Sequence, residues 1–277
     1  MLLQDYFVPR NNEASLKGII PFIFPLFLVA ITLFSCEKVI DPDLKEAETR
    51  LVIEAVITDV PDSACVVRIS QTTPFTSTGK FIGISNATVQ LSDGELPPVS
   101  LNMTEPGVYT TTDIKGTPGH LYYLSVQHDG KTYTATSQMP DPVPLDTLYQ
   151  STEHLIGETF FMLKGTYTDP AERENFYRTK TSLNGDFGRG ISVSSDEDYN
   201  GIERPINIML RRETIVGDTV DFYFFCIDKS SYTYFYSLRQ MMDSNAASPA
   251  NPQSNIAGGC LGYFSAHTVE SKRIIIQ

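Results

Sequence analysis

The chain has 277 residues, of which 41% are hydrophobic, and it carries a formal net charge of −12 at pH 7. The length allows one or two domains. The negative charge argues against nucleic acid as a partner, because a phosphate backbone would be repelled and no basic stripe offsets the repulsion.

The first 35 residues have the layout of a bacterial lipoprotein signal peptide. Residues 19–34 are almost wholly apolar, but they contain two prolines and fall short of the roughly 20 residues that a bilayer-spanning helix needs. The stretch ends in LFSC, which resembles a lipobox. We therefore expect cleavage after residue 35 and acylation of Cys36, with palmitate among the chains that hold the protein on the membrane. The alternative is a short uncleaved anchor with an incidental cysteine.

Residues 36–48 follow as a charged segment that contains Pro42 and shows no sustained helical or strand period. We interpret this segment as an extended acidic tether. Glu37 stands where an aspartate is associated with retention in the inner membrane, so the outer membrane is the expected destination.

Residues 49–140 carry short alternating apolar runs broken by turn residues, which predicts a mainly β fold that starts with an immunoglobulin- or transthyretin-like sandwich. We expect strands at 51–60, 65–75, 87–93, 98–103, 107–112, 120–127 and 131–139. The last two form the clearest hairpin, because Asp129-Gly130 suits the positive φ angles of a tight turn. Residues 141–145 are rich in proline, which cannot join a strand ladder, and they predict a linker between domains.

Residues 146–277 predict a second β-rich domain with one helix. Its expected strands are 146–154, 159–169, 175–184, 206–215, 218–228, 259–266 and 269–275. Because residues 218–228 are apolar on both faces, we expect them to lie centrally and to be covered on two sides. Ser230 or Ser231 can cap a helix near 231–243, whose apolar stripe would supply one of the two covers.

Several segments together resemble a known family. They are LVIEAVITD, GHLYYLSVQHDGKTYTATSQMPDPVPLDTL, DPAERENFYR and NPQSNIAGGCLGYFSAH, in this order. In this order, the segments resemble those of the lipoproteins that contain domain of unknown function 4249 (DUF4249), which are typical of Bacteroidota. The resemblance implies a lipid-anchored, β-rich cell-envelope protein, often encoded near TonB-dependent outer-membrane receptors. It implies no reaction and no catalytic residues.

Calcium is the metal that best suits the sequence, although we expect no obligatory cofactor. Asp196, Asp198 and Asn200 place oxygen ligands at alternate positions ahead of a glycine, as in the first half of a calcium loop, and Glu203 could complete the set. The competing interpretation is an acidic hairpin turn with Asn200-Gly201 at its tip.

Catalytic motifs do not stand out in the sequence. It contains no GxSxG elbow and no HExxH pair, so we expect a protein that is not an enzyme, with a hydrolase of unfamiliar design as a weaker alternative. Tyr232 and Tyr236 fall together off the apolar stripe of the predicted helix, where they could stack on a ligand or cover the sheet. The expected function is that of an accessory or binding partner of a TonB-dependent receptor. The alternative is direct capture of a glycan or peptide.

Overall fold

The computed structural model describes residues 48–73, 82–155, 157–243 and 251–277, and in these residues the protein is mainly β with one helix. The predicted signal peptide and Cys36 lie outside the described residues, as does nearly all of the tether. Within the described part, no helix is long and apolar enough to cross a bilayer. The strands of the first half are β1 (Leu51–Thr58), β2 (Cys65–Gln71), β3 (Ile82–Gly83), β4 (Thr88–Ser92), β5 (Val99–Ser100), β6 (Asn102–Glu105), β7 (Val108–Thr111), β8 (Leu121–His128) and β9 (Lys131–Gln138).

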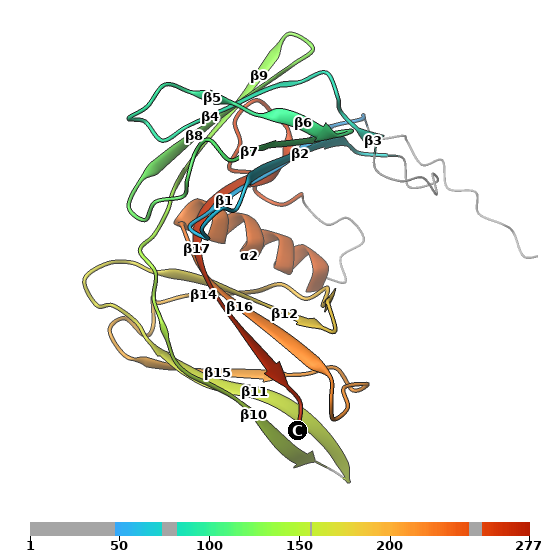
Figure 1. Ribbon diagram of the computed structural model, residues 1–277, viewed down its shortest axis with the longest axis vertical. Helices are drawn as coiled ribbons and strands as arrows, with labels where there is room; N and C mark the ends of the chain where they lie inside the picture. The colour runs from blue at the N-terminus through green and yellow to red at the C-terminus, as the bar shows by residue number, and fades with distance from the viewer. Residues whose placement is uncertain (1–47, 74–81, 156, 244–250) are drawn as a thin grey trace, which may run out of the picture. The chain divides into compact units, whose positions relative to one another are not determined.

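The second half holds the helix and longer strands (Figure 1). They are β10 (Leu145–Leu155), β11 (Glu158–Thr168), β12 (Phe176–Leu183), β13 (Asp186–Phe187), β14 (Ser192–Ser195), β15 (Glu203–Met209), β16 (Thr219–Ile227), α2 (Lys229–Asp243) and β17 (Leu261–Ile275). Three short strands, β3, β13 and β14, were not predicted, and β15 ends earlier than expected. After β15 the chain turns at Arg211, whose carbonyl accepts the Thr214 amide at 3.1 Å.

The first half is the predicted β-sandwich. The strands β1, β2, β7 and β6 belong to one sheet, and β5, β4, β8 and β9 form a second, four-stranded sheet. Alternate residues of both sheets share one buried core, as the period of two requires. Its members include Ile53, Val67, Leu91, Leu124 and Phe264.

The hairpin of β8 and β9 has the turn that the sequence predicts. His128 pairs with Lys131, so the loop between them is the two residues Asp129 and Gly130, with φ angles of 48° and 72°. Positive φ at both positions is the geometry that matches the twist of a tight hairpin. This register fixes which side chains of β9 face outward.

Strand β16 is central and covered on both faces, as predicted. It lies between β12 and β17 in its sheet. On one face Phe222 and Phe224 join a core with the three-stranded sheet of β10, β11 and β15. On the other face Phe225 and Ile227 pack with α2. The helix is therefore one of the two covers.

Helix α2 begins two residues earlier than expected, and its cap is Asp228 rather than a serine. The Asp228 carboxylate accepts the Ser231 amide at 2.8 Å, which satisfies a donor at the helix start. The same carboxylate accepts the Ser137 hydroxyl of β9 at 2.9 Å, and the Ser137 oxygen accepts the Ala266 amide at 2.8 Å. The cap thus ties the helix to strands of both halves.

The last strand, β17, is one strand of 15 residues where the sequence predicted two. Its first part pairs in parallel with β1, from Leu261 opposite Val52, and its second part pairs antiparallel with β16 (Figure 1). One sheet therefore contains strands from both sides of the Pro-rich segment 141–145. The division into domains at that segment stays a prediction.

The three cysteines of the described residues are free and buried. They are Cys65, Cys226 and Cys260. Burial raises the pKa of Cys65 to about 12, and raises the pKa values of Cys226 and Cys260 to about 11. These thiols behave as small apolar side chains rather than as nucleophiles.

Candidate functional site

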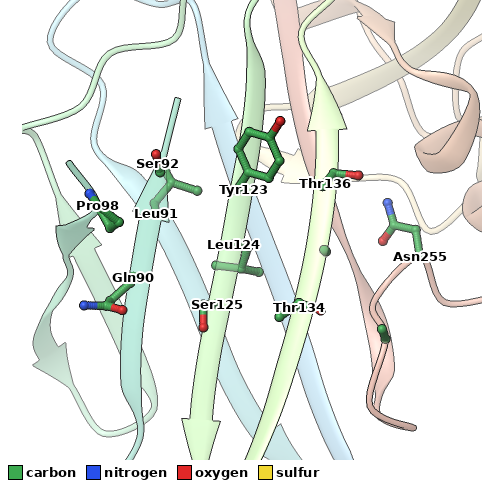
Figure 2. A pocket seen from close by; sticks show the side chains of 12 residues that line it. Gln90, Leu91, Ser92, Pro98, Tyr123, Leu124, Ser125, Thr134, Thr136 and Asn255 are labelled. Carbon is green, nitrogen blue, oxygen red and sulfur yellow. The ribbon is translucent and has the colours of Figure 1, made fainter. Parts of the chain in front are cut away.

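A groove of about 540 Å³ lies on the outer face of the four-stranded sheet (Figure 2). Its floor is formed by β4, β8 and β9, Pro98 lies on one side, and the segment around Asn255 and Ala257 lies on the other. All twelve lining residues are uncharged at neutral pH. The groove is therefore uncharged, and its lining combines hydroxyl and amide groups with apolar surface.

Two rows of side chains cross the groove from strand to strand. One row is Gln90, Ser125 and Thr134, and the other is Ser92, Tyr123 and Thr136. Neighbours within a row are about 4.8 Å apart, the spacing of paired strands. The residues between the rows, such as Leu91 and Leu124, turn their side chains into the sandwich core. Strict alternation thus gives this sheet a hydrophobic inner face and a hydroxyl-rich outer face.

Tyr123 is the exposed aromatic ring of the groove, with 44% of its surface accessible. The turn after β4 packs against the ring: Gly94 has φ +81°, and a Cβ there would lie only 3.0 Å from a ring carbon. Asp93 holds this turn by accepting the amides of Glu95 and Leu96 at 3.1 and 2.9 Å. The hydrogen bond from the Leu96 amide is the main reason that the pKa of Asp93 is lowered.

The wall opposite Pro98 is a segment fixed to β17. The Asn255 side chain donates to the Phe264 carbonyl at 2.7 Å and accepts the Phe264 amide at 2.9 Å. Two residues on, Ala257 exchanges backbone hydrogen bonds of 2.8 and 3.3 Å with Thr134. Gly258 is needed here, because its φ is +107° and a Cβ would approach the Tyr133 ring to 2.7 Å. The Asn- and Gly-rich segment noted in the sequence therefore builds one side of the groove.

The sequence-predicted site residues lie elsewhere, and the structure brings several of them together. Tyr232, Asp196 and Asn200 line a second cavity, of about 500 Å³, beside α2. The Tyr232 ring lies 5.6 Å from that of Tyr236 and 4.9 Å from that of Phe176, between ring centroids. Tyr236 is 38% exposed and Tyr232 is partly buried. The tyrosine pair predicted for binding thus borders the loop predicted for calcium.

The proposed calcium ligands have different surroundings. Asp196 is 5% exposed and accepts the Asn175 amide at 2.7 Å, whereas Asp198 is exposed. Glu203 starts β15 and pairs with Thr168. In the described ranges, no group of three or more His, Cys, Asp or Glu side chains is placed to hold a metal ion.

The turn at Gly201, with φ +77°, is present, but the prediction of a hairpin is wrong. The strand before the turn, β14, pairs with β12, and the strand after it, β15, pairs with β11 in a different sheet. The acidic turn therefore connects two sheets. A local sequence pattern shows that the chain turns but not where the next strand goes.

The groove residues on β4, β8 and β9 were not singled out in the sequence. The signal was present in TYTATSQ, residues 132–138, where Thr134 and Thr136 alternate with residues of the core. Such alternation is common to every half-exposed strand. Only the pairing of β4, β8 and β9 shows that the polar positions of three strands form two continuous rows.

The comparison with known families shows to which family the chain belongs. The sequence model of a family described as domain of unknown function (DUF4249) matches residues 37–273, which is most of the chain. The chain belongs to this family. The match confirms the resemblance found in the sequence, and the wall of the groove in this DUF4249 protein lies inside the matched region.

Other comparisons add little to the family assignment of this DUF4249 protein. No curated protein gives a significant match. Among solved structures, the chain is similar to bovine butyrophilin at 10% sequence identity, over 64% of this chain and 92% of that chain, with a TM-score of 0.22. A TM-score this low supports no argument about fold.

Proposed function

We propose that this DUF4249 protein is a lipid-anchored cell-envelope protein that binds rather than catalyses, as an accessory of a TonB-dependent receptor in the outer membrane. The lipobox-like LFSC sequence supports the anchor at Cys36, and the resemblance to lipoproteins that are often encoded near TonB-dependent receptors supports the receptor. In this proposal the groove on the β4–β8–β9 sheet faces the ligand.

The observation that carries the proposal is the composition and rigidity of the groove. Its polar side chains project from three strands that are hydrogen-bonded to one another, so the backbone positions that carry these side chains are fixed without a ligand. A preformed arrangement lowers the entropy cost of binding. Hydroxyl and amide groups both donate and accept hydrogen bonds, which suits recognition of a ligand that carries polar groups.

The anchor and the receptor can be tested together in cells. We expect the wild-type chain to incorporate labelled palmitate, to fractionate with outer membranes and to co-purify with a TonB-dependent receptor after gentle crosslinking in detergent. Because the acyl chains hold the protein on the membrane, Cys36→Ala should lose all three properties. Cys260→Ala is the matched control, since Cys260 is buried and free, and it should lose none.

A wild-type chain that takes up no palmitate would contradict the anchor. A lipidated chain that yields no receptor after crosslinking would contradict the accessory role. In that case the groove favours the second candidate function, which is direct capture of a glycan or peptide without an obligate receptor. Photo-crosslinkers at Thr136 in the groove and at Tyr236 beside α2 would show which surface holds the captured molecule.

A further inference from the structure

We infer that the groove on the β4–β8–β9 sheet binds an uncharged oligosaccharide, one sugar ring of which packs against Tyr123. The inference rests on the proposed function to the extent that the groove is taken as a ligand site. It adds the chemical class of the ligand. It does not depend on the receptor or on the lipid anchor.

Several polar groups are left available in the groove. The side chains of Gln90, Ser125, Thr134 and Thr136 make no hydrogen bond to any other residue that the structure describes. By contrast, Ser92 is engaged in the turn after β4, where its hydroxyl accepts the Gly94 amide at 3.0 Å, and Asn255 is engaged with Phe264. The available groups are hydroxyls and a carboxamide, which donate and accept as sugar hydroxyls do.

The groove also contains an aromatic ring in a position that suits a sugar. A sugar ring has a rim of hydroxyl groups and a face of C–H groups, so it needs polar partners and one apolar surface. Tyr123 offers an exposed ring that is amphipathic, and it lies in the row between Ser92 and Thr136. The backbone at Gly94 supports the ring from the side. Figure 2 shows Tyr123 on the same face as Ser125 and Thr136.

The lining of the groove carries no charge at neutral pH. The lining has no basic side chain that could pair with a phosphate, a sulfate or a carboxylate, and the net charge of −12 repels such groups. The lining also has no carboxylate that could pair with a cation. Recognition here must therefore use neutral hydrogen bonds and stacking, which an uncharged glycan supplies.

The backbone pairing of the groove strands favours a glycan over an extended peptide. A peptide that adds to a sheet needs a free strand edge, because its backbone must pair with unpaired amides and carbonyls. Inside the groove β8 is paired on both sides, with β4 and with β9. At the outer edge of β9, Ala257 already pairs with Thr134. Along β8, and at Thr134 of β9, the groove thus presents side chains rather than open backbone.

The test measures binding of purified chain, residues 37–277, to short uncharged oligosaccharides of glucose, mannose and xylose, by glycan array and then by calorimetry. The same oligosaccharides carrying uronate units form the charged arm. We expect the uncharged set to contain the binder and the uronates to bind more weakly.

Loss of the Tyr123 ring should weaken binding about tenfold in Tyr123→Ala, and Tyr123→Phe should retain the binding. Thr134→Val keeps the shape but removes the hydroxyl, and should weaken binding about fivefold.

The matched control is Tyr149→Ala, because Tyr149 is also an exposed tyrosine, on β10 in a different sheet. It should bind the oligosaccharide as the wild type does.

Binding that survives Tyr123→Ala and Thr134→Val, in variants whose melting temperature is unchanged, would overturn the groove as the site. Binding to none of the uncharged oligosaccharides, or preference for the uronates, would overturn the ligand class. Recovery of a receptor without glycan binding would leave the proposed function standing, and glycan binding without a receptor would leave only this inference standing.

Discussion

At the scale of single residues, His267 is the buried group with the clearest energetic consequence. It lies on β17 with its Nδ1 atom 3.0 Å from the Ser265 hydroxyl, and its ring meets the Phe225 ring edge-on at 5.2 Å. Burial, and after it the positive charge of Arg178, together lower the pKa of His267 to about 4. The imidazole is therefore neutral in the folded protein over a range where the unfolded chain binds a proton.

This difference predicts that acid destabilises the fold through His267. The stabilisation is complete above about pH 6.5, is lost as the pH falls toward about 4, and amounts to about 3 kcal/mol in free energy of unfolding. In His267→Gln the loss of stability between about pH 7.5 and about pH 4.5 should shrink by about 2 to 3 kcal/mol, measured by urea unfolding. His154→Gln, at an exposed position of β10, is the control and should keep the wild-type pH dependence. Equal pH dependence in all three proteins would contradict this role of His267.

At the scale of elements, the parallel pairing of β1 with β17 depends on one glycine. Gly262 has φ +100°, and a Cβ at this position would lie 2.0 Å from the Ile53 carbonyl oxygen. The two strands can therefore meet only if position 262 has no side chain. Gly259, three residues earlier, also has positive φ (+85°), but a Cβ there would meet open space.

Substitution of the two glycines distinguishes the cost of backbone strain from the cost of a steric clash. Gly259→Ala should cost about 1 kcal/mol in free energy of unfolding, from the left-handed backbone alone. Gly262→Ala should cost about 3 kcal/mol or more, because β1 and β17 must move apart. Guanidinium chloride unfolding of both variants gives the comparison. Similar costs for the two substitutions would show that the close contact with Ile53 does not limit the pairing.

At the scale of the whole molecule, β17 belongs to the cores of both halves. Phe264 and Ala266 are fully buried with the first sandwich, and Ile276, just past the end of β17, is buried in the core of the second half. A stretch at the end of the chain therefore completes a sandwich whose other strands are contributed by residues 51–138. Contacts of such long sequence separation form late and at high entropy cost.

This arrangement predicts that residues 37–145 do not fold cooperatively by themselves. Without β17 the fragment lacks a buried strand next to β1 and leaves its core open to water. Joining residues 251–268 to it through a flexible Gly-Ser linker should restore a cooperative thermal transition by circular dichroism. A sharp transition in the unassisted fragment would instead establish the first half as independent of β17.

The sequence alone determined what depends on near neighbours. Alternation predicted most strands, Asp129-Gly130 predicted the β8–β9 turn, and the apolar faces of residues 218–228 predicted a central strand. These features are local because a strand or a helix displays its two faces within a few residues. The four family segments likewise carried the family assignment without any structure.

Only the tertiary structure decided which strands are neighbours. The pairing of β1 with β17 joins residues about 200 positions apart, and no local pattern specifies it. The same holds for the groove: Ser125, Thr134 and Tyr123 read as ordinary outward-facing residues until the register of β4, β8 and β9 aligns them in rows. Periodicity indicates which face of each strand is buried, but the partner and the register are determined by packing of the whole core, and the surface of the groove follows from that packing.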